Sequence, residues 1–260
     1  MMPAPGQFEI KKTGDDFPIS KAALGSLLII KNGINRTMGK KLAEDLQDPF
    51  ATAELVEIII NQSYPHKSLI DIIGAVVGLI ILAPFYPFLA LAIKLDSPGP
   101  ALVKLNRISQ GRIFDLYKFR TMMANAEELK PLLRQFNERR DSPFFKMRRD
   151  PRVTRVGRFL RRFRLDELPQ LINVLQGEMS LVGPRPVEPS EAVQYPASHR
   201  HLLFAKAGVT GLSQIKGSSA LAFQQTLEYD DYYLKNQSLA LDIKIISTTL
   251  AILLFDHNAV

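Results

Sequence analysis

Apolar positions are distributed unevenly along the chain and divide it into three parts. Residues 1–66 alternate short apolar runs with polar stretches, a pattern that predicts a small mixed α/β extension of unknown role. Residues 69–95 form the one long apolar run of the sequence. From Asp96 onward, short periodic segments alternate with turn signals. We therefore expect an N-terminal extension over residues 1–66 and a membrane-anchored domain over residues 67–260.

The apolar run over residues 69–95 is the candidate membrane segment. A straight helix of its uncharged residues 72–93, at about 1.5 Å per residue, is just long enough to cross a bilayer core. Pro84 and Pro87 each remove a backbone donor inside the run, so we expect a break at Ala83 and Pro84. A broken helix can return as a re-entrant hairpin with both ends on one side of the membrane. A plain spanning helix and a buried core helix are the alternatives.

Short elements of both kinds follow the apolar run. Residues 104–122 predict two strands joined through Gly111, and residues 124–140 predict an amphipathic surface helix. Residues 155–164 predict a basic helix capped by Thr154, which could lie at a membrane interface. Its apolar stripe consists of Val156, Phe159, Leu160 and Phe163. The predicted fold class is α+β: a mostly helical monotopic membrane protein with a proline-broken re-entrant membrane helix, a short β-hairpin and amphipathic interfacial helices.

The positive charge of the chain is concentrated in one segment. Eleven basic and two acidic residues lie between Arg139 and Arg164, a local charge of +9 in a chain whose net charge is +7. Such a segment can hold anionic lipid headgroups or an anionic substrate. The chain has no cysteine, so a thiolate nucleophile and a Cys-ligated metal are excluded. Its first residues include acids and prolines, so we expect no cleaved signal peptide.

Two adjacent carboxylates, Asp166 and Glu167, open a short helical pattern at residues 168–176. If Asp166 lies at or next to the N-cap, the positive helix end and the surrounding arginines are expected to lower its pKa. Pro169 suits the first turn of this helix and Gly177 suits its C-terminal stop. An ionised carboxylate can serve as a metal ligand or a nucleophile, whereas plain helix capping is the competing interpretation.

Four motifs occur in order along the chain. They are YKFRTM at 117–122, LDELPQLINVLQGEMSLVGPRP at 165–186, GVTGLSQIKG at 208–217 and DDYYLKNQSLALDIKII at 230–246. With these motifs the chain resembles the bacterial sugar transferase family, the monotopic polyprenyl-phosphate hexose-1-phosphate transferases, from about residue 67 to its C-terminus. Members carry a re-entrant membrane helix broken at a Ser-Pro pair, which here reads Ala83-Pro84.

The resemblance implies an activity and a location. It implies transfer of a sugar 1-phosphate from a nucleotide-diphosphate sugar, for example a UDP-sugar, to undecaprenyl phosphate. The reaction would take place at the cytoplasmic face of the bacterial inner membrane, with Mg²⁺ as cofactor, and would begin the assembly of a surface glycan. The implied partners are the nucleotide-diphosphate sugar, undecaprenyl phosphate and membrane lipids, without nucleic acid, and a homodimer is left open.

The resemblance also implies a role for each matching residue. Asp166 would attack the sugar-linked phosphorus and form a phosphosugar–enzyme intermediate, which the lipid phosphate attacks in turn. Glu167 would be the metal-associated partner, so Asp166 and Glu167 are the expected metal ligands. The residues expected to bind the substrate and its phosphates are Lys118, Arg120, Arg161, Arg185 and Asp230. A structural surface turn is the alternative for Arg185, and a helix start is the alternative for Asp230.

Some features leave the functional interpretation open. Ser218 and Ser219 stand where many members have an arginine that holds the substrate phosphate. The alternatives are that Arg107 or Arg112 supplies that charge, that the donor sugar is bound differently, or that activity is reduced. His199 and His201 have no third ligand nearby in the sequence, so we assign them to an exposed loop. One competing function is a catalytically silent member that scaffolds a glycan-assembly complex. The other is a basic membrane or nucleic-acid binding module, for which no stacking platform or recognition helix is evident.

Overall fold

The computed structural model describes residues 64, 66–138, 142–147, 149–217 and 220–255. All of these lie in one unit of the chain, Ala53–Val260. The predicted extension over residues 1–66 lies outside the described residues except for Tyr64 and His66. Its boundary and its role therefore stay predictions.

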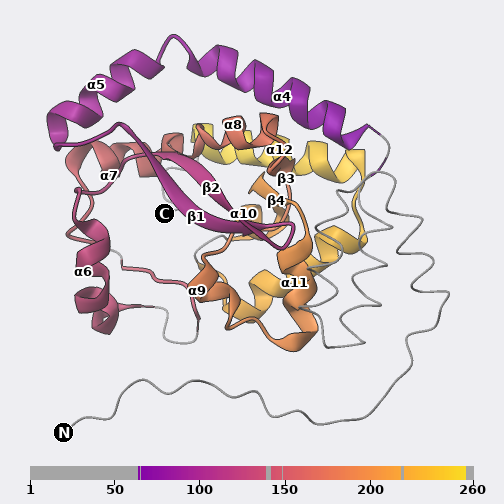
Figure 1. Cartoon of the computed structure of the whole chain (residues 1–260). Coiled ribbons are helices and arrows are strands. Elements are labelled where there is room, and N and C mark those ends of the chain that lie inside the picture. The colour runs from indigo at the N-terminus through magenta and orange to yellow at the C-terminus, as the bar shows by residue number, and fades with distance from the viewer. Residues whose placement is uncertain (1–63, 65, 139–141, 148, 218–219, 256–260) are drawn as a thin grey trace, which may run out of the picture. The chain divides into compact units, whose positions relative to one another are not determined.

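Helices and two small sheets make up the described part of the chain (Figure 1). The elements are α4 (Lys67–Leu82), α5 (Tyr86–Asp96), β1 (Leu102–Ser109), β2 (Arg112–Phe119), α6 (Ala126–Leu133), η2 (Arg134–Phe136), α7 (Arg155–Arg162), η3 (Leu165–Glu167), α8 (Gln170–Leu175), β3 (Met179–Val182), α9 (Pro189–Ala192), η4 (Ala197–Phe204), β4 (Ala207–Thr210), α10 (Leu212–Lys216), α11 (Phe223–Lys235) and α12 (Leu239–Phe255), where η marks a 3-10 helix. This mixture confirms the α+β class.

The first sheet is the predicted hairpin. β1 and β2 pair antiparallel, with Leu102 opposite Phe119 at one end and Ser109 opposite Arg112 at the other. The two turn residues, Gln110 and Gly111, both have left-handed backbones, with φ of 53° and 67°. A two-residue turn of this kind matches the right-handed twist of paired strands, so the hairpin follows from the local sequence.

The second sheet was not predicted from the sequence. β3 and β4 pair in parallel, with Met179 opposite Ala207, and the chain between them contains α9 and η4. The backbones approach closely at Gly208 in β4 and at Gly183, which follows β3. A Cβ atom on Gly208 would lie 2.1 Å from the backbone nitrogen of Gly183, so only glycine fits there. The pairing brings the two motifs GEMSLVGPRP and GVTG side by side.

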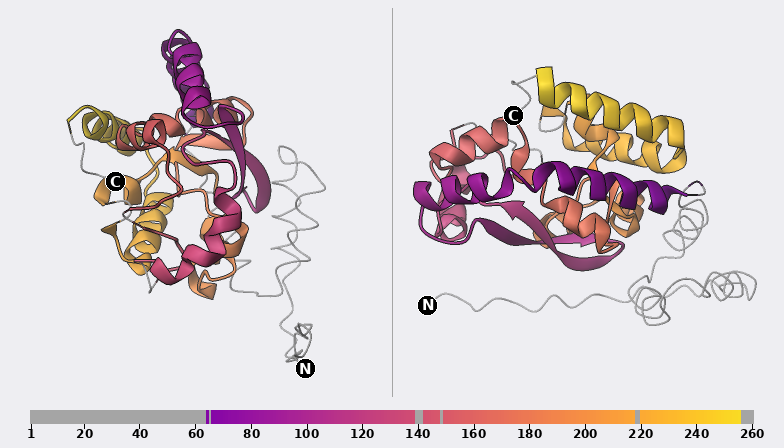
Figure 2. Two further views of the ribbon diagram at one scale, coloured as in Figure 1. Left: turned by 90° about the vertical axis from the view of Figure 1, so that its left-hand side faces the viewer. Right: turned by 90° about the horizontal axis from the view of Figure 1, so that it is seen from above.

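The apolar run forms two helices, α4 and α5, which are bent by 65° at the predicted break (Figures 1 and 2). Ala83 donates the last hydrogen bond of α4, to the carbonyl of Leu79, and Pro84 has no donor with which to continue it. Pro87 lies in the first turn of α5, where its missing donor costs nothing. Within the described part of the chain, no single helix is long and apolar enough to span a bilayer, and this pair meets the criterion only jointly.

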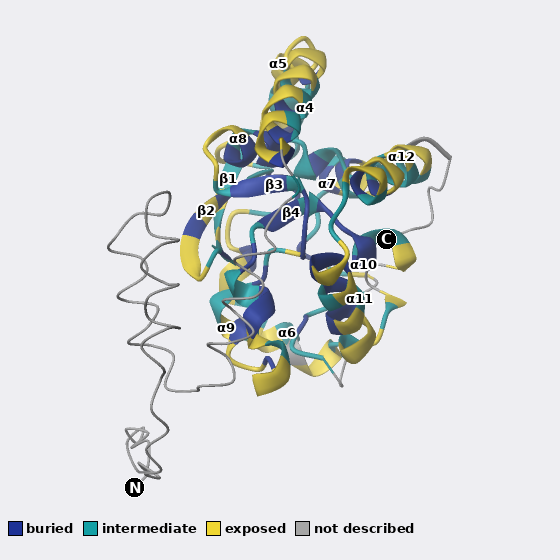
Figure 3. Ribbon diagram, turned by 90° about the vertical axis from the view of Figure 1, so that its right-hand side faces the viewer, coloured by how far each residue is buried: buried dark blue, intermediate teal, exposed yellow. Residues whose placement is uncertain are grey.

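The face of α4 that packs against the rest of the protein carries small residues. Cβ atoms on Gly74 and Gly78 would lie 2.5 Å from Leu181 Cδ1 and 2.6 Å from Leu171 Cδ1. Most of the large side chains of both helices are exposed, whereas Leu82 and Ile93 are buried, and Figure 3 shows α4 and α5 standing out from the other elements with exposed residues along them. The most exposed of these are Ile80, Ile81, Phe88 and Leu95. An apolar surface of this extent is typical of a membrane or protein contact.

The two predicted amphipathic helices differ from expectation. α6 ends at Leu133 and tightens into η2, with Pro131 inside the helix, so it is shorter than the predicted segment 124–140. α7 is capped as predicted, because Thr154 Oγ1 accepts from the Gly157 amide at 3.0 Å. Its apolar stripe divides, since Leu160 is fully buried whereas Phe159 is exposed.

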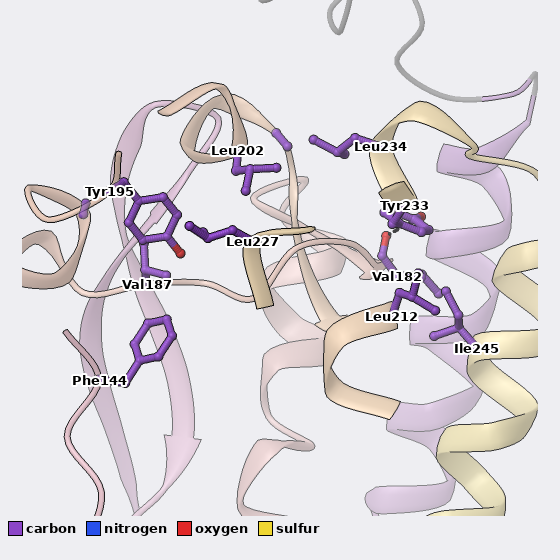
Figure 4. Close-up of a cluster of buried hydrophobic side chains, with 12 residues drawn as sticks. Phe144, Val182, Val187, Tyr195, Leu202, Leu212, Leu227, Tyr233, Leu234 and Ile245 are labelled. Atoms are coloured by element: carbon purple, nitrogen blue, oxygen red, sulfur yellow. Dashed lines mark hydrogen bonds between the residues drawn. The ribbon is translucent and has the colours of Figure 1, made fainter. Parts of the chain in front are cut away.

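Three clusters of buried apolar side chains form the core. The largest joins α11 and α12 to β3 and the segments around α9 and η4, and includes Val182, Leu227, Tyr233 and Ile245 (Figure 4). The second lies between α4, α8 and the hairpin and includes Ala75, Leu116, Leu171 and Met179. The third joins the bent helix pair to β2 and α7 and consists of Leu82, Ile93, Ala101, Phe119 and Leu160.

Buried polar contacts fasten the first turns of α4. Lys67 and Asp242 form an ion pair in which both side chains are almost fully buried. The hydroxyls of Tyr64 and Tyr233 lie 3.0 and 2.8 Å from the same carboxylate. One turn further along α4, Asp71 accepts hydrogen bonds from the Ser180 hydroxyl and the Leu181 amide. These contacts set the position of α4 against α12 and β3.

Removing Lys67 should therefore destabilise the protein strongly. Lys67→Met leaves the Asp242 carboxylate buried without its counter-charge, and we expect the free energy of unfolding to fall by about 3–5 kcal/mol. The matched control is Lys235→Met, because Lys235 pairs with Asp231 on the surface, where such a pair contributes about 1 kcal/mol or less. Thermal unfolding in detergent measures both. Equal losses in the two variants would contradict this account of α4.

Candidate active site

Lys118, Asp166 and Glu167 come together although they lie far apart in the sequence. Lys118 belongs to β2, and its Nζ lies 2.8 Å from Glu167 Oε1 and 3.5 Å from Asp166 Oδ2. The Asp166 side chain is almost buried, with 10 % of it exposed, whereas 32 % of the Glu167 side chain is exposed. Asp166 is thus more deeply buried than Glu167, and both carboxylates contact the Lys118 ammonium group.

The local backbone separates this pair of acids from the helix that follows. Asp166 and Glu167 lie in the 3-10 turn η3, which is preceded by Arg164 in a left-handed conformation with φ of 50°. The N-cap position of α8 is occupied by Pro169, so the prediction that Asp166 caps this helix or lies beside its cap is wrong. Gly177 follows the C-terminus of α8 with φ of 77°, which confirms it as the stop.

The two carboxylates differ in their proton affinity. Burial raises the pKa of Asp166, because the loss of solvation outweighs the attraction of Lys118 and Arg161 and the charge of Glu167 adds repulsion. The prediction of a lowered pKa for Asp166 is therefore wrong. Burial also acts to raise the pKa of Glu167, but Lys118 and the nearby Arg185 and Arg164 outweigh it and lower that pKa. Adjacent acids in different environments can perform different tasks.

Two predicted arginines lie close enough to act on these acids electrostatically. Arg161 Nε donates to Thr121 Oγ1 at 2.9 Å, and its charge attracts Asp166. Arg185 is exposed, its charge lowers the pKa of Glu167, and its guanidinium lies 5.7 Å from the centre of the Phe144 ring. With Arg164, which also acts on Glu167, the site combines two carboxylates with one lysine and three arginines.

Arg120 makes a different set of contacts. It is buried, and its guanidinium donates to the carbonyls of Ile93, Ser97 and Pro98 at the C-terminal end of α5. Gly99 leaves room for this group, since a Cβ there would lie 2.1 Å from Arg120 Nη1. These bonds hold the end of α5, and they do not support the prediction that Arg120 binds a substrate phosphate.

Asp230 lies beneath the turn that carries Arg185. It is only 3 % exposed, and it accepts from the Ser213 hydroxyl at 2.7 Å and from the backbone N–H of Arg185. Burial raises the pKa of Asp230 to about 7, although these bonds and the Arg185 charge act in the opposite direction. The structure thus gives Asp230 a supporting contact to the Arg185 turn and leaves its predicted contact with substrate untested.

Sequence reasoning missed a buried amide that supports Lys118. Asn173 on α8 is fully buried, accepts from the Tyr117 amide at 3.0 Å and donates to the Asp115 carbonyl at 2.8 Å. It also donates to Glu178 Oε2 at 2.7 Å. A polar residue within the apolar pattern LINVL was the available signal, because a buried amide needs partners.

The other basic candidates and His201 lie in different surroundings. Arg107 pairs with Glu188 at 3.3 Å, whereas Arg112 is exposed at the tip of the hairpin. Ser218 and Ser219 lie outside the described residues, so the substitution at that position stays untested. The assignment of His201 to an exposed loop is wrong, because its ring is buried in η4 and lies 2.8 Å from Asp231 Oδ1.

The acidic side chains of the site are too few to enclose a divalent cation by themselves. Among the residues that the structure describes, no group of three or more His, Cys, Asp or Glu side chains could hold a metal ion. Mg²⁺ at phosphate-transfer sites, however, is often bound through only one or two carboxylates, with water and substrate phosphate oxygens completing its coordination. Asp166 and Glu167 fit a site of that kind.

The sequence of this part of the chain matches a known protein family. The family model described as bacterial sugar transferase matches residues 62–256, and the chain therefore belongs to this family.

Several curated proteins are similar over the same region. The chain is 41 % identical over 201 residues to the galactosyl transferase CpsE of Streptococcus agalactiae serotype III, covering 75 % of this chain and 44 % of that protein. It is 41 % identical over 192 residues to the undecaprenyl-phosphate galactose phosphotransferase of Salmonella typhimurium, covering 72 % and 40 %. It is 36 % identical over 191 residues to the exopolysaccharide production protein ExoY of Sinorhizobium fredii, covering 71 % and 83 %. The chain thus spans less than half the length of the first two relatives.

The raised pKa of Asp230 predicts a dependence of stability on pH. In the folded protein this carboxyl stays protonated up to about pH 7, so its contribution to stability is present at low pH and is lost as the pH rises through 7. Asp230→Asn should therefore change the free energy of unfolding little at pH 4 and increase it by about 1 kcal/mol or more at pH 8. Thermal unfolding of both proteins across this range is the measurement. A pH-independent difference would refute the assignment.

Proposed function

We propose that this chain transfers a sugar 1-phosphate from a nucleotide-diphosphate sugar to undecaprenyl phosphate. The observation that carries the proposal is the pair of unequal carboxylates, Asp166 and Glu167, held by Lys118 in a member of the bacterial sugar transferase family. The name of the Salmonella relative supports undecaprenyl phosphate as the acceptor. The name of a relative from Erwinia amylovora, UDP-galactose-lipid carrier transferase, supports a UDP-sugar as the donor. The name of ExoY supports a role in exopolysaccharide production.

In the proposed reaction Asp166 is the nucleophile. Its carboxylate oxygen bonds to the sugar-linked phosphorus as the bond from that phosphorus to the nucleoside monophosphate breaks. An oxygen of the lipid phosphate then attacks the same phosphorus and releases Asp166. Both displacements occur at phosphorus, so the configuration at the anomeric carbon is retained. Burial suits Asp166 to this role, because a carboxylate that loses solvation is more basic than an exposed one.

The cations around the dyad have complementary tasks in this proposal. Lys118 balances the charge of Glu167 and lies close enough to Asp166 to keep it oriented. Arg161 and Arg185 stabilise the negative charge on the transferred phosphate and on the leaving group. Arg185 lies between two prolines, so its planar guanidinium loses little freedom when it binds a phosphate.

We propose that Asp166 and Glu167 also hold Mg²⁺ together with the donor diphosphate. A bound Mg²⁺ would neutralise part of the diphosphate charge, which two neighbouring carboxylates would otherwise repel. Glu167, which ionises more readily and is more exposed, is the better placed of the two to act mainly as a metal ligand.

We also propose that α4 and α5 form a re-entrant membrane segment in the bacterial inner membrane, with the active site on the cytoplasmic face. The support for this is the outward apolar surface of the bent pair and the basic helix α7, which contacts α5. The exposed residues of α7 are Arg155, Arg158, Phe159 and Arg162. Such a combination of arginines and an aromatic ring is suited to anionic headgroups.

Substitution of Asp166 tests the proposed activity directly. Purified protein in detergent with Mg²⁺, a panel of radiolabelled UDP-sugars and undecaprenyl phosphate should yield a lipid-linked product. Asp166→Asn should lower kcat/KM by roughly a thousandfold or more, because an amide is a poor nucleophile. The matched control is Asp115→Asn, which alters an exposed carboxylate that pairs with Lys104 on the same hairpin and should leave turnover unchanged. EDTA should stop the reaction and added Mg²⁺ should restore it.

The outcomes separate the alternatives. Full turnover by Asp166→Asn would exclude Asp166 as the nucleophile. Absence of a lipid-linked product from the unsubstituted protein with every donor would instead favour a catalytically silent scaffold.

A further inference from the structure

The C-terminal end of α5 is bonded to the strand that carries Lys118. Arg120 follows Lys118 by two positions, and its guanidinium donates to the carbonyls of Ser97 and Pro98 at 2.6 and 2.8 Å and to that of Ile93 at 3.3 Å. In addition, the Arg120 backbone amide donates to the Ala101 carbonyl at 2.8 Å. The end of β2 is therefore held directly against the end of the apolar helix pair.

The same end of α5 is bonded to the segment that carries the two acids. The Asp96 carboxylate accepts from the backbone amide of Val156 at 2.8 Å and from the hydroxyl of Thr154, the residue that caps α7. These two bonds, together with the charges of Arg155 and Arg158, hold the pKa of Asp96 below its ordinary value. α7 ends at Arg162, four positions before Asp166. Asp96 thus fixes the start of the helix that leads to the acids.

The two segments are also bonded to each other beside this point. Thr121 accepts from the Thr154 amide at 3.0 Å through its carbonyl and from Arg161 Nε at 2.9 Å through its hydroxyl. A shared apolar cluster completes the contact, with Ile93 from α5, Phe119 from β2 and Leu160 from α7. Strand, helix and apolar pair therefore meet at one place, and none of the three can shift without disturbing the others.

We propose that Asp96 is a positioning residue, through which the end of α5 sets the distance between Lys118 and the pair Asp166 and Glu167. The geometry of the reaction centre then depends on the helix pair whose apolar side chains face outward. The kinetic part of this inference rests on the proposed function. Asp96 acts through α7, because its carboxylate binds Thr154 and Val156 at the start of that helix.

The test compares Asp96→Ala with Asp96→Asn. Alanine removes both hydrogen bonds to the start of α7, whereas the amide oxygen of asparagine still accepts them. Asp96→Ala should lower kcat by roughly 10- to 100-fold, since a shift of about 1 Å in a reacting group has an effect of this size. KM for the donor should change by less than about threefold, because the donor-binding arginines are retained. Asp96→Asn should keep most of the activity, and both variants should bind liposomes as the unsubstituted protein does.

A second measurement reports the distance without requiring activity. The chain has no cysteine, so Lys118→Cys and Glu167→Cys together introduce the only two thiols. A short thiol-reactive crosslinker should join them quickly in the otherwise unchanged protein and in the Asp96→Asn background. In the Asp96→Ala background the crosslinking should be clearly slower.

Controls distinguish positioning from a general loss of stability. Ser109→Ala removes a side chain that accepts from the Ala207 amide and donates to the Glu178 carbonyl, and it should lower the thermal midpoint without lowering kcat. The proposal is overturned if Asp96→Ala keeps full kcat and crosslinks normally, if Asp96→Asn is as impaired as Asp96→Ala, or if Ser109→Ala loses as much kcat. If the unsubstituted protein has no turnover, the proposed function fails, and the crosslinking rates alone then decide whether Asp96 positions the two segments.

Discussion

One ammonium group holds two adjacent carboxylates in a partly buried turn. Without Lys118, the charges of Asp166 and Glu167 would repel each other, and burial would penalise both. The interaction also constrains the fold, because the lysine belongs to β2 and the acids belong to η3. Asn173 holds the strand against α8, and Thr121 holds it against α7. The geometry of the proposed active site therefore depends on how these segments pack.

The apolar helix pair is attached to the rest of the protein by apolar packing along its inner face and by polar contacts at its two ends. Lys67 and Asp71 hold the beginning of α4, whereas Asp96 and the carbonyls that Arg120 binds hold the end of α5. Between these ends, small residues of α4 allow close packing, and most of the large apolar side chains remain on the outside. This arrangement leaves the side chains that would contact lipid free of any structural role in the core. It also connects the end of α5 to the candidate catalytic groups, because Arg120, which binds that end, lies two positions from Lys118.

Features that depend on neighbouring residues could be predicted from the sequence. The hairpin turn at Gly111, the break at Pro84, the Thr154 cap and the helix stop at Gly177 each follow from the backbone preference of one or two residues. The family resemblance, not local pattern, assigned Lys118, Asp166 and Glu167 to one site, but the contact of Lys118 with the two acids was not predicted.

Features that depend on distant parts of the chain could not be predicted in this way. The parallel pairing of β3 with β4 joins segments separated by α9 and η4, and the ring of His201 is buried against Asp231 on another helix. The direction of the Asp166 pKa shift was mispredicted because nearby arginines in the sequence were taken as neighbours in space. Of those arginines, Arg161 acts on Asp166, but burial has the larger effect. Burial is a property of the whole packed structure, and a charge count along the chain does not report it.

The central claim is that the buried Asp166, and not the more exposed Glu167, becomes covalently linked to the transferred phosphosugar. Mass spectrometry of the protein after incubation with a UDP-sugar and Mg²⁺, without undecaprenyl phosphate, measures this directly. We expect an added mass of one sugar phosphate on Asp166, which disappears when undecaprenyl phosphate is added. An adduct on Glu167, or complete turnover with no adduct at any time in rapid-quench samples, would contradict it.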